Sequence, residues 1–414
     1  MKFETVSVIG LGYIGLPTAA VLASRGVRVL GVDVNKRVVD ALNKGEVTIV
    51  EPDLDMVVQA AVLTGKLSAS TVPQPADAFL IAVPTPFKDD HVPDLSYIEA
   101  VSKAIAPVLK RGDLVVLEST SPVGATEQMA EWMAATRPDL TFSHQTGNDA
   151  DIHVAHCPER VLPGHVMREL VENDRVIGGL SPKATEMAAQ LYRTFVTGEC
   201  LQTDARTAEL CKLTENSFRD VNIAFANELS LVAERFGIDV WELISLANRH
   251  PRVNILQPGP GVGGHCIAVD PWFIVHSAPD RARLIRTARE VNDYKPHYVI
   301  EKIVEAAKGI AQPRIACLGL AFKADIDDLR ESPSLDIVKH LAKMKLGELL
   351  VVEPYIEALP RSLEGFDHLR LVGVEEAIRS ADIVVVLVNH KPFLSIDRAL
   401  LTGRHVIDTR GAWR

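Results

Sequence analysis

The sequence predicts an α/β protein with two doubly wound domains, joined by a long central helix and a further helical region. Short apolar runs alternate with helical stretches over residues 1–203 and again over 311–414, whereas one long helical period fills residues 204–236. Such alternation is typical of a parallel sheet covered by helices on both faces. We therefore expect three domains, at residues 1–203, 204–310 and 311–414.

The first domain is expected to contain a parallel sheet, because its apolar runs have the length of buried strands. These runs lie at residues 6–9, 29–32, 78–83, 114–118, 153–156 and 175–178. A helical pattern over residues 17–24 separates the first two runs and stops at Gly26.

The central region begins with a helix whose apolar residues follow a helical period, and they predict a buried stripe along it. The stripe consists of Leu210, Leu213, Val221, Phe225, Leu229 and Val232. Residues 257–265 are rich in proline and glycine and predict a loop, after which helical sequence resumes at 281–310. In the last domain we expect strands at 315–322, 349–352, 383–388 and 405–408, and helices at 335–344 and 374–379.

The composition excludes some classes of partner. The chain has 414 residues, with 44 Lys and Arg against 54 Asp and Glu, and this net charge of -10 argues against broad binding to nucleic acid or an anionic membrane. The start lacks the features of a signal peptide, and no apolar run approaches the length of a membrane span. Five scattered cysteines indicate a reducing compartment, so we expect a cytoplasmic protein without membrane insertion.

A glycine-rich turn follows the first predicted strand and opens a helix. Gly10, Gly12 and Gly15 form the pattern G-x-G-x-x-G, and Asp33 ends the next strand. Glycines permit a tight turn and close approach of a pyrophosphate, while the acid binds ribose hydroxyls. We therefore predict a Rossmann-like domain that binds NAD, since Asp33 would repel the extra phosphate of NADP. Because Arg37 could contact the extra phosphate, NADP stays a possible cofactor. The alternative to dinucleotide binding is that the glycines form a purely structural turn.

Cys266 is the candidate nucleophile. It follows Gly263, Gly264 and His265, and Asp270 stands four residues after it. Glycines let a substrate approach the backbone closely, and a thiol in such a loop is accessible. The remaining cysteines are expected to be small buried hydrophobic residues; they are Cys157, Cys200, Cys211 and Cys317.

Polar residues recur at helical spacing in the central helix, namely Glu209, Lys212, Asn216 and Arg219. Such a stripe is usually a solvated surface. In an interdomain helix, however, Lys212 could lower the pKa of a nearby thiol, and Asn216 could hold a water or an oxyanion.

Further candidates stand at strand ends, where doubly wound folds bind ligands. Thr120 and Glu159 follow two strands of the first domain, although each could instead belong to a helix cap or a turn. In the last domain Lys323, Arg330 and Arg410 follow strands and could hold a diphosphate, or be ordinary surface cations. That domain lacks G-x-G-x-x-G, so we expect no second dinucleotide, and no metal-ligand spacing occurs, so we expect no metal.

Six motifs along the chain resemble those of the UDP-glucose/GDP-mannose dehydrogenases. They are Gly10-Leu-Gly-Tyr-Ile-Gly-Leu-Pro17, Glu118-Ser-Thr-Ser-Pro-Val-Gly124, Cys157-Pro-Glu-Arg160, Glu209-Leu-Cys-Lys-Leu-Thr-Glu-Asn216, Gly263-Gly-His-Cys266 and Phe322-Lys-Ala-Asp-Ile-Asp-Asp-Leu-Arg-Glu-Ser332. The resemblance implies an N-terminal NAD domain, a central helical dimerisation region, a C-terminal Rossmann-like domain that binds the sugar nucleotide, and a homodimer.

The resemblance also implies site residues. Cys266 is the implied nucleophile, and the residues implied to handle protons, water and the oxyanion are Lys212, Asn216, Asp270, Thr120 and Glu159. The implied NAD contacts are Gly10, Gly12, Tyr13, Ile14, Gly15, Asp33, Arg37, Thr85, Thr120 and Arg330. The implied substrate contacts are Glu159, Arg160, Lys212, Asn216, Gly263, Lys323, Arg410 and, across the dimer, Arg252.

Within the family, the residues around Cys266 resemble the branch that oxidises UDP-N-acetylhexosamines. His265 and Val269 stand where UDP-glucose enzymes more often carry serine and lysine, and Pro163 replaces an acid that those enzymes tend to have. The expected reaction is four-electron oxidation at C6 of UDP-N-acetyl-D-mannosamine through a Cys266 thioester, in bacterial surface polysaccharide synthesis that includes enterobacterial common antigen.

Several other hypotheses on the function remain open. UDP-N-acetylglucosamine or UDP-glucose is an alternative substrate. A two-electron dehydrogenase with a structural Cys266 is an alternative reaction. A noncatalytic sensor of nucleotide sugars is the alternative outside enzymes.

Overall fold

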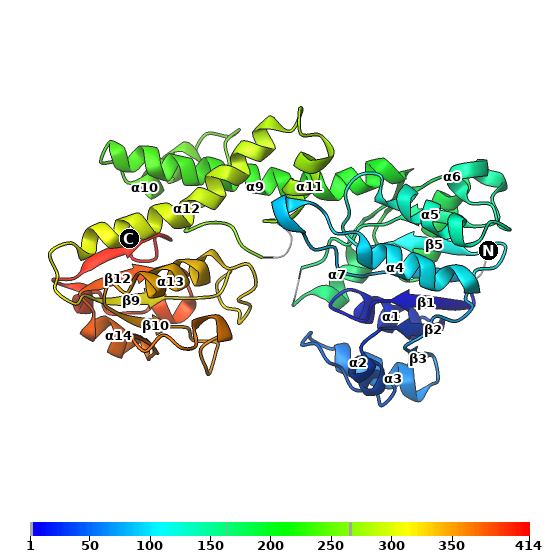
Figure 1. The fold of residues 1–414 in the computed structure, drawn as a ribbon, viewed down its shortest axis with the longest axis horizontal. Coiled ribbons are helices and arrows are strands. Elements are labelled where there is room, and N and C mark those ends of the chain that lie inside the picture. The colour runs from blue at the N-terminus through cyan, green and yellow to red at the C-terminus, as the bar shows by residue number, and fades with distance from the viewer. Residues whose placement is uncertain (1–2, 163, 265–266) are drawn as a thin grey trace. The chain divides into compact units, whose positions relative to one another are not determined.

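The computed structural model describes residues 3–162, 164–264 and 267–414. The chain forms two compact units, Met1–Glu215 and Asn216–Arg414. Both are α/β, as the sequence predicts, and Figure 1 shows a sheet with flanking helices in each. The division into three domains stays a prediction, since its middle part, residues 204–310, is shared between the two units.

The first unit contains an eight-stranded sheet in the order β3-β2-β1-β4-β5-β6-β7-β8. Its strands are β1 (Thr5–Ile9), β2 (Arg28–Val32), β3 (Leu67–Ser70), β4 (Ala78–Ile81), β5 (Leu114–Leu117), β6 (His153–His156), β7 (Arg175–Gly179) and β8 (Cys200–Asp204). Neighbouring strands are parallel except β6 and β7, which are antiparallel, so the expectation of a wholly parallel sheet was wrong there. The chain re-enters the sheet at the edge where β6 ends, and no crossover is therefore needed.

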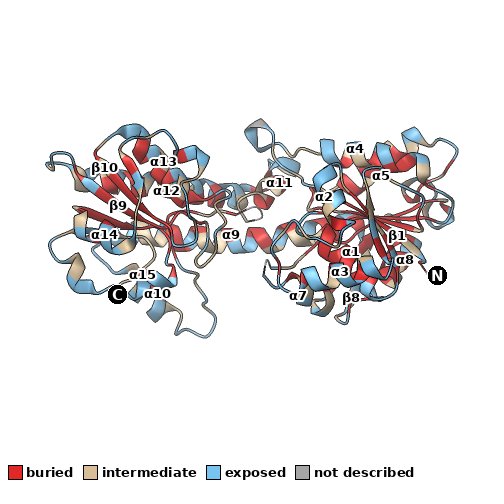
Figure 2. Ribbon diagram, turned by 90° about the horizontal axis from the view of Figure 1, so that it is seen from below, coloured by how far each residue is buried: buried red, intermediate tan, exposed pale blue. Residues whose placement is uncertain are grey.

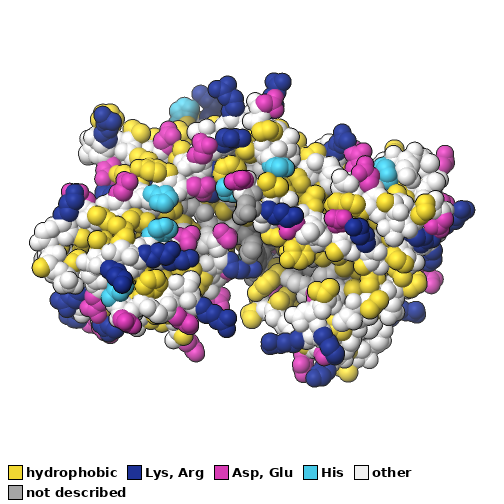
Figure 3. Space-filling model, in the orientation of Figure 1, with side chains coloured by type: hydrophobic (Ala, Val, Ile, Leu, Met, Phe, Trp, Pro, Cys, Tyr) yellow, Lys and Arg dark blue, Asp and Glu magenta, His cyan; other side chains and the backbone are white. Residues whose placement is uncertain are grey.

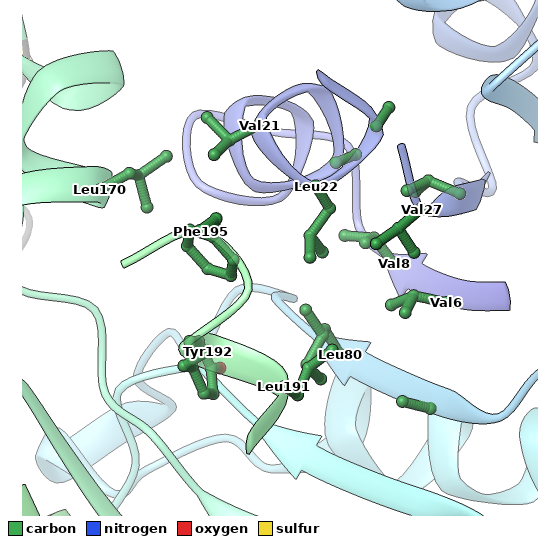
Figure 4. Packing of buried hydrophobic residues seen from close by; sticks show 14 of the residues in the cluster. Val6, Val8, Val21, Leu22, Val27, Leu80, Leu170, Leu191, Tyr192 and Phe195 are labelled. Carbon is green, nitrogen blue, oxygen red and sulfur yellow. The ribbon is translucent and has the colours of Figure 1, made fainter. Parts of the chain in front are cut away.

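Alternating side chains of the central strands fill two cores, one on each face of this sheet. Val6 and Val8 of β1 belong to one core and Ile9 to the other. The first core is covered by α1 (Gly15–Ser24), α3 (Leu54–Leu63), α7 (Val166–Glu172) and α8 (Pro182–Tyr192), and Figure 4 shows Val21, Leu22, Leu191 and Tyr192 packed there. The second is covered by α4 (Ser96–Ile105) and α5 (Ala125–Thr136).

The second unit contains a five-stranded parallel sheet in the order β11-β10-β9-β12-β13. Its strands are β9 (Arg314–Leu318), β10 (Glu348–Val352), β11 (Leu369–Leu371), β12 (Ile383–Val386) and β13 (His405–Asp408). Helices α12 (Arg283–Ala307) and α13 (Pro333–Met344) pack on one face, and α14 (Val374–Ser380) packs on the other. In Figure 2 the buried residues follow the strands of both sheets.

Helix α9 (Ala205–Arg235) runs from the first unit into the second. The prediction of a buried stripe along it was largely wrong, because Leu213 is buried whereas Leu210, Phe225 and Val232 are 42%, 52% and 46% exposed. The side of α9 that faces the chain carries small and polar residues instead, namely Ala208, Glu209, Asn216, Ser217, Asp220, Ala224, Ala226, Asn227 and Ala233. Several of its large apolar residues, among them Phe225 and Val232, thus point to the outside of this chain.

The remaining helices are short. They are α2 (Lys36–Leu42), α6 (Ser143–Thr146), α10 (Val240–Ala247), α11 (Asp270–Ser277) and α15 (Lys391–Leu394). Within the described ranges, no helix combines the length and apolar character needed to cross a membrane. On the face seen in Figure 3, side chains of both charges are interspersed.

Candidate active site

The glycine-rich turn of the first unit has the shape that a dinucleotide needs. A Cβ on Gly15 would lie 1.8 Å from the carbonyl oxygen of Gly10, and one on Gly10 would lie 2.4 Å from that of Ala82. At Gly12, by contrast, nothing lies within 4 Å of where a Cβ would stand. Two glycines therefore permit the tight turn, while the third leaves open space beside the N-terminus of α1, where a pyrophosphate would bind.

Asp33 lies directly after β2 and contacts this turn. Its Oδ2 accepts a hydrogen bond from the backbone N–H of Leu11 at 2.9 Å, and its Oδ1 accepts one from Asn35 at 2.8 Å. Each carboxylate oxygen keeps a second lone pair for a ribose hydroxyl. Tyr13 and Arg37 are exposed near the same turn and strand end. The residues present thus fit NAD.

Two threonines meet beyond the next strands. Thr85 follows β4 and Thr120 follows β5, and the Thr85 hydroxyl donates to the Thr120 carbonyl oxygen at 2.6 Å. The carboxyl ends of β1, β4 and β5 lie at one edge of the sheet, because these strands are parallel. The predicted NAD contacts of this unit therefore gather at the edge expected for a doubly wound fold.

Glu159 lies after β6 and is paired with Arg175. The two side chains are 7% and 2% exposed, and Arg175 Nη1 donates to Glu159 Oε2 at 2.6 Å. Glu159 Oε1 accepts from the backbone N–H of Arg160. This pairing follows from the antiparallel entry of β7, which brings its first residue to the edge where β6 ends. No motif in the sequence pointed to Arg175 as a partner of Glu159.

A second carboxyl lies behind this pair. Glu118 is buried after β5, and the Tyr192 hydroxyl donates to its Oε1 at 2.6 Å. Burial raises the pKa of Glu118 to about 7, the Tyr192 hydrogen bond opposes this shift, and the Glu159 charge adds to it. Arg175 also lies 5.7 Å from the centre of the Tyr192 ring. The cluster thus holds one guanidinium and two carboxyls.

The first turns of α9 carry the polar stripe that the sequence singled out, and its members differ in role. Buried Glu209 accepts from the N–H groups of Gly124 and Thr126 and so caps the start of α5. Lys212 is half-buried. Glu215, which lies in the same turns of α9 but outside the stripe, forms an ion pair with Arg160 at 2.7 Å.

In the second unit Asn216 and Asp270 form a buried pair. Asn216 Nδ2 donates to Asp270 Oδ2 at 2.5 Å, and the residues are 7% and 2% exposed. Asp270 is the first residue of α11. His265, Cys266 and Pro163 lie outside the described residues. The structure thus joins two predicted catalytic residues, of which Asp270 stands four residues after Cys266 in the sequence.

The glycines of the loop before Cys266 allow close packing. A Cβ on Gly263 would lie 2.3 Å from the Glu331 carbonyl oxygen, and one on Gly264 would lie 2.9 Å from the Phe322 ring. A Cβ on Gly259 would lie 2.6 Å from Arg410 Nη1. The loop therefore rests against two segments that carry the predicted substrate cations Lys323 and Arg410.

A cavity of about 730 Å³ opens beside Arg410. It is lined by Trp241, Ile244, Ser245, Asn248, Arg249, Gln257, Pro258, Asn389, Leu394, Arg410, Gly411, Ala412 and Arg414. Burial lowers the pKa of Arg410 to about 10, opposed by Asp408, so its guanidinium stays charged at neutral pH. Sequence reasoning found Arg410 but missed Trp241 and Asn248, because they stand in no motif.

Other predicted residues lie apart from this cavity. Arg330 is exposed and paired with Asp328 at 2.6 Å, while Arg252 and Lys323 are exposed. Of the other cysteines, Cys157 and Cys317 are buried as predicted, and burial raises the pKa of each thiol to about 12. Cys200 and Cys211 are only half-buried. In the described part of the chain, no group of His, Cys, Asp and Glu side chains is arranged to hold a metal.

The chain is similar to known proteins along nearly its whole length. The chain matches the UDP-glucose/GDP-mannose dehydrogenase family in its NAD binding domain (residues 4–196), central domain (206–294) and UDP binding domain (316–414). An NDP-N-acetyl-D-galactosaminuronic acid dehydrogenase of Ralstonia nicotianae is 67% identical over 100% of this chain and 97% of its own. A UDP-N-acetyl-D-mannosamine dehydrogenase of Yersinia pestis is 61% identical over 100% of both.

A solved structure of a UDP-D-ManNAc dehydrogenase from Pyrococcus horikoshii has a TM-score of 0.87 to this chain at 39% identity, and covers 99% of this chain and 96% of its own. The matches extend over nearly the whole chain, including the glycine-rich turn and the domain that carries Arg410. The chain therefore belongs to the UDP-glucose/GDP-mannose dehydrogenase family and is an NAD-dependent oxidoreductase acting on nucleotide sugars.

Proposed function

We propose that the protein oxidises C6 of UDP-N-acetyl-D-mannosamine to the carboxylate, with Cys266 as covalent nucleophile. The observation that carries the mechanism is the buried hydrogen bond between Asn216 and Asp270, because Asp270 stands four residues after Cys266 in the sequence. A buried amide and carboxyl at that place supply a donor for an oxyanion and a group that moves a proton.

The reaction balances in four steps. The C6 alcohol loses a hydride and a proton and becomes an aldehyde, and the Cys266 thiol adds to it to give a thiohemiacetal. Loss of a second hydride and proton gives a thioester. Water then cleaves the C–S bond, which yields the uronate and restores the thiol. NAD, held at the Gly10–Gly15 turn and Asp33, would supply the hydride acceptor for each oxidation, so two NAD would be consumed per sugar, and covalent capture retains the aldehyde.

The remaining roles are proposed from the sequence resemblance. Lys212 and Asn216 stabilise the oxyanion, and Asp270 and Glu159 transfer protons directly or through water. Arg175 Nη1 donates to Glu159 Oε2 and so holds this carboxyl group in one orientation. Thr120 belongs to the NAD edge of the first sheet, where it meets Thr85.

The nucleotide is assigned to the cavity beside Arg410. A guanidinium that stays charged in a largely buried place is suited to a diphosphate. Lys323 and Arg252 are the further phosphate ligands proposed, the latter from a second subunit. Trp241 offers an aromatic surface in the same cavity.

A second substrate is favoured by one observation. The Ralstonia relative, named for an N-acetyl-D-galactosaminuronic acid, is more similar to this chain than the mannosamine enzyme of Yersinia, at 67% against 61% identity. A UDP-N-acetylhexosamine of galactose configuration is therefore the second candidate. The proposed use of the product in surface polysaccharide synthesis, including enterobacterial common antigen, rests on the sequence resemblance.

A homodimer is proposed from the outward face of α9. Phe218, Phe225 and Val232 recur at intervals of seven residues and are 68%, 52% and 46% exposed. Residues at this spacing share one face of a helix. Such an apolar face is typical of an interface between subunits.

The function is tested by measuring NADH formed per sugar consumed. UDP-N-acetylmannosamine, UDP-N-acetylgalactosamine, UDP-N-acetylglucosamine and UDP-glucose are compared in parallel. About two NADH per sugar, with the mannosamine compound preferred, is expected. About one NADH per sugar would show a two-electron dehydrogenase, preference for another sugar would replace the substrate, and binding of all four without turnover would show a sensor.

A further inference from the structure

A chain of buried polar side chains connects two helices of the second unit to the loop before Cys266. Asp220 and Asn227 belong to α9, and Arg289 and Asn292 belong to α12. None of the four is more than 2% exposed. Buried polar groups of this kind are stable only when they are hydrogen-bonded.

The hydrogen bonds run in one direction. The backbone N–H of Gly259 donates to Asn227 Oδ1 at 2.8 Å, and Asn227 Nδ2 donates to Asn292 Oδ1 at 2.9 Å. Asn292 Nδ2 then donates to Asp220 Oδ1 at 2.8 Å, where Arg289 Nη1 also donates at 2.7 Å. The chain thus ends on a carboxylate whose charge Arg289 balances.

Asn227 is therefore fixed at both ends of its amide. Its NH₂ group must face Asn292 Oδ1, so its oxygen must face the loop. Gly259 is buried, and its N–H needs this acceptor. One residue of α9 thus determines where the first part of the loop lies.

The rest of the loop is held by packing. A Cβ on Gly261 would lie 2.8 Å from Pro333 Cβ and 3.0 Å from Pro296 Cγ, so the backbone lies close against both prolines. After the Cys266 segment, Asp270 is held by Asn216, which also belongs to α9. Helix α9 therefore contacts the chain on both sides of the candidate nucleophile.

We propose that Asn227 is a positioning residue that holds the loop before Cys266 in place through Gly259. The expected loss of turnover rests on the proposed function of Cys266. The clamp, by which we mean the hydrogen bond from Gly259 N–H to Asn227 that holds the loop, does not depend on that function. Loss of the Asn227 amide frees the Gly259 N–H and lets the loop shift. Displacements near 1 Å at a reacting group lower turnover by up to about 100-fold.

The test compares three variants in the full-length protein. Asn227→Ala removes the acceptor of Gly259. Asn292→Ala keeps that acceptor but removes the group that orients it. Asn222→Ala is the control, because Asn222 also belongs to α9 but bonds to the Phe218 carbonyl oxygen of its own helix.

Two quantities are measured, namely kcat and KM for the nucleotide sugar, and hydrogen–deuterium exchange of peptides from the loop, α9 and α12. For Asn227→Ala we expect kcat to fall at least about 10-fold with KM changed by less than about threefold. Exchange in residues 257–264 should become at least about 10-fold faster, while the helices keep their protection. Asn292→Ala should shift both quantities in the same direction by less, and Asn222→Ala should shift neither.

Three results would overturn the inference. They are unchanged loop exchange in Asn227→Ala, faster loop exchange with unchanged kcat, and faster exchange throughout α9 and α12, which would show general destabilisation. Cys266→Ser separates this failure from that of the proposed function. If that variant still makes the uronate, the nucleophile is wrong, while loop exchange in Asn227→Ala still reports on the clamp.

Discussion

Removal of Arg175 should destabilise the first unit strongly, because it leaves the Glu159 carboxylate buried without its cation. In Arg175→Met, Glu159 loses the 2.6 Å bond to Nη1 and keeps the N–H of Arg160. Breaking a buried pair on one side costs about 3–5 kcal/mol. With a urea m-value of about 3 kcal/mol/M, the midpoint of unfolding should fall by about 1–2 M.

The assay is urea unfolding at pH 7, followed by circular dichroism. Arg379→Ala is the matched control, because Arg379 pairs with Glu375 on the surface, where the two side chains are 59% and 68% exposed. Exposed pairs contribute less than about 1 kcal/mol. Adding Glu159→Gln to Arg175→Met should recover most of the lost stability. If Arg175→Met costs no more than Arg379→Ala, the buried pair does not stabilise the fold as argued.

Three further predictions follow from the structure. Burial raises the pKa of Glu118 from 4.5 to about 7, so the folded state binds more protons than the unfolded state, and the free energy of unfolding falls by on the order of 3 kcal/mol as pH rises through this range. In urea unfolding, Glu118→Gln should therefore be more stable relative to the wild type at pH 8 than at pH 5. An equal difference in stability at both pH values would contradict this. Gly12→Ala should keep the melting temperature and raise the Kd for NAD at least about 10-fold, because the added methyl group would occupy the space where the pyrophosphate is expected. Gly15→Ala should instead lower the melting temperature, because its Cβ would lie 1.8 Å from the Gly10 carbonyl oxygen. Calorimetry and NAD titration test both variants, and unchanged NAD binding by Gly12→Ala would be inconsistent with that site. Phe225→Asp should convert the proposed homodimer to a monomer in sedimentation velocity, since Phe225 is 52% exposed on the outward face of α9. A wild-type protein that sediments as a monomer, or an unchanged sedimentation coefficient in the variant, would contradict the proposed interface.

The central strands and the glycine-rich turn could be predicted because they depend on local sequence. The apolar runs that form β1, β4, β5 and β12 are buried on both faces, so hydrophobicity alone marks them. Strands β3, β8 and β11 were missed because they are partly exposed and form no continuous apolar run. Their pairing depends on neighbouring strands rather than on their own pattern.

The candidate site was predictable where a residue belongs to a motif. Asp33, Asn216 and Asp270 were each expected as site residues, and the structure adds that Asp33 accepts from Leu11 and that Asn216 donates to Asp270. Arg175 and Asn227 could not be found, because their partners are 16 and 32 residues away and their contacts depend on the antiparallel β7 and on the packing of the loop. The buried stripe predicted along α9 was largely wrong for a related reason. A helical period of apolar residues indicates an apolar face, but it does not show whether the same chain covers that face.

The most direct test of covalent catalysis is to quench the enzyme in acid during turnover and to identify the peptide that contains Cys266 by mass spectrometry. The account predicts that this peptide carries the nucleotide-sugar acyl group as a thioester, and that Cys266→Ser forms no uronate. Absence of the adduct, together with two NADH per sugar from Cys266→Ser, would contradict it.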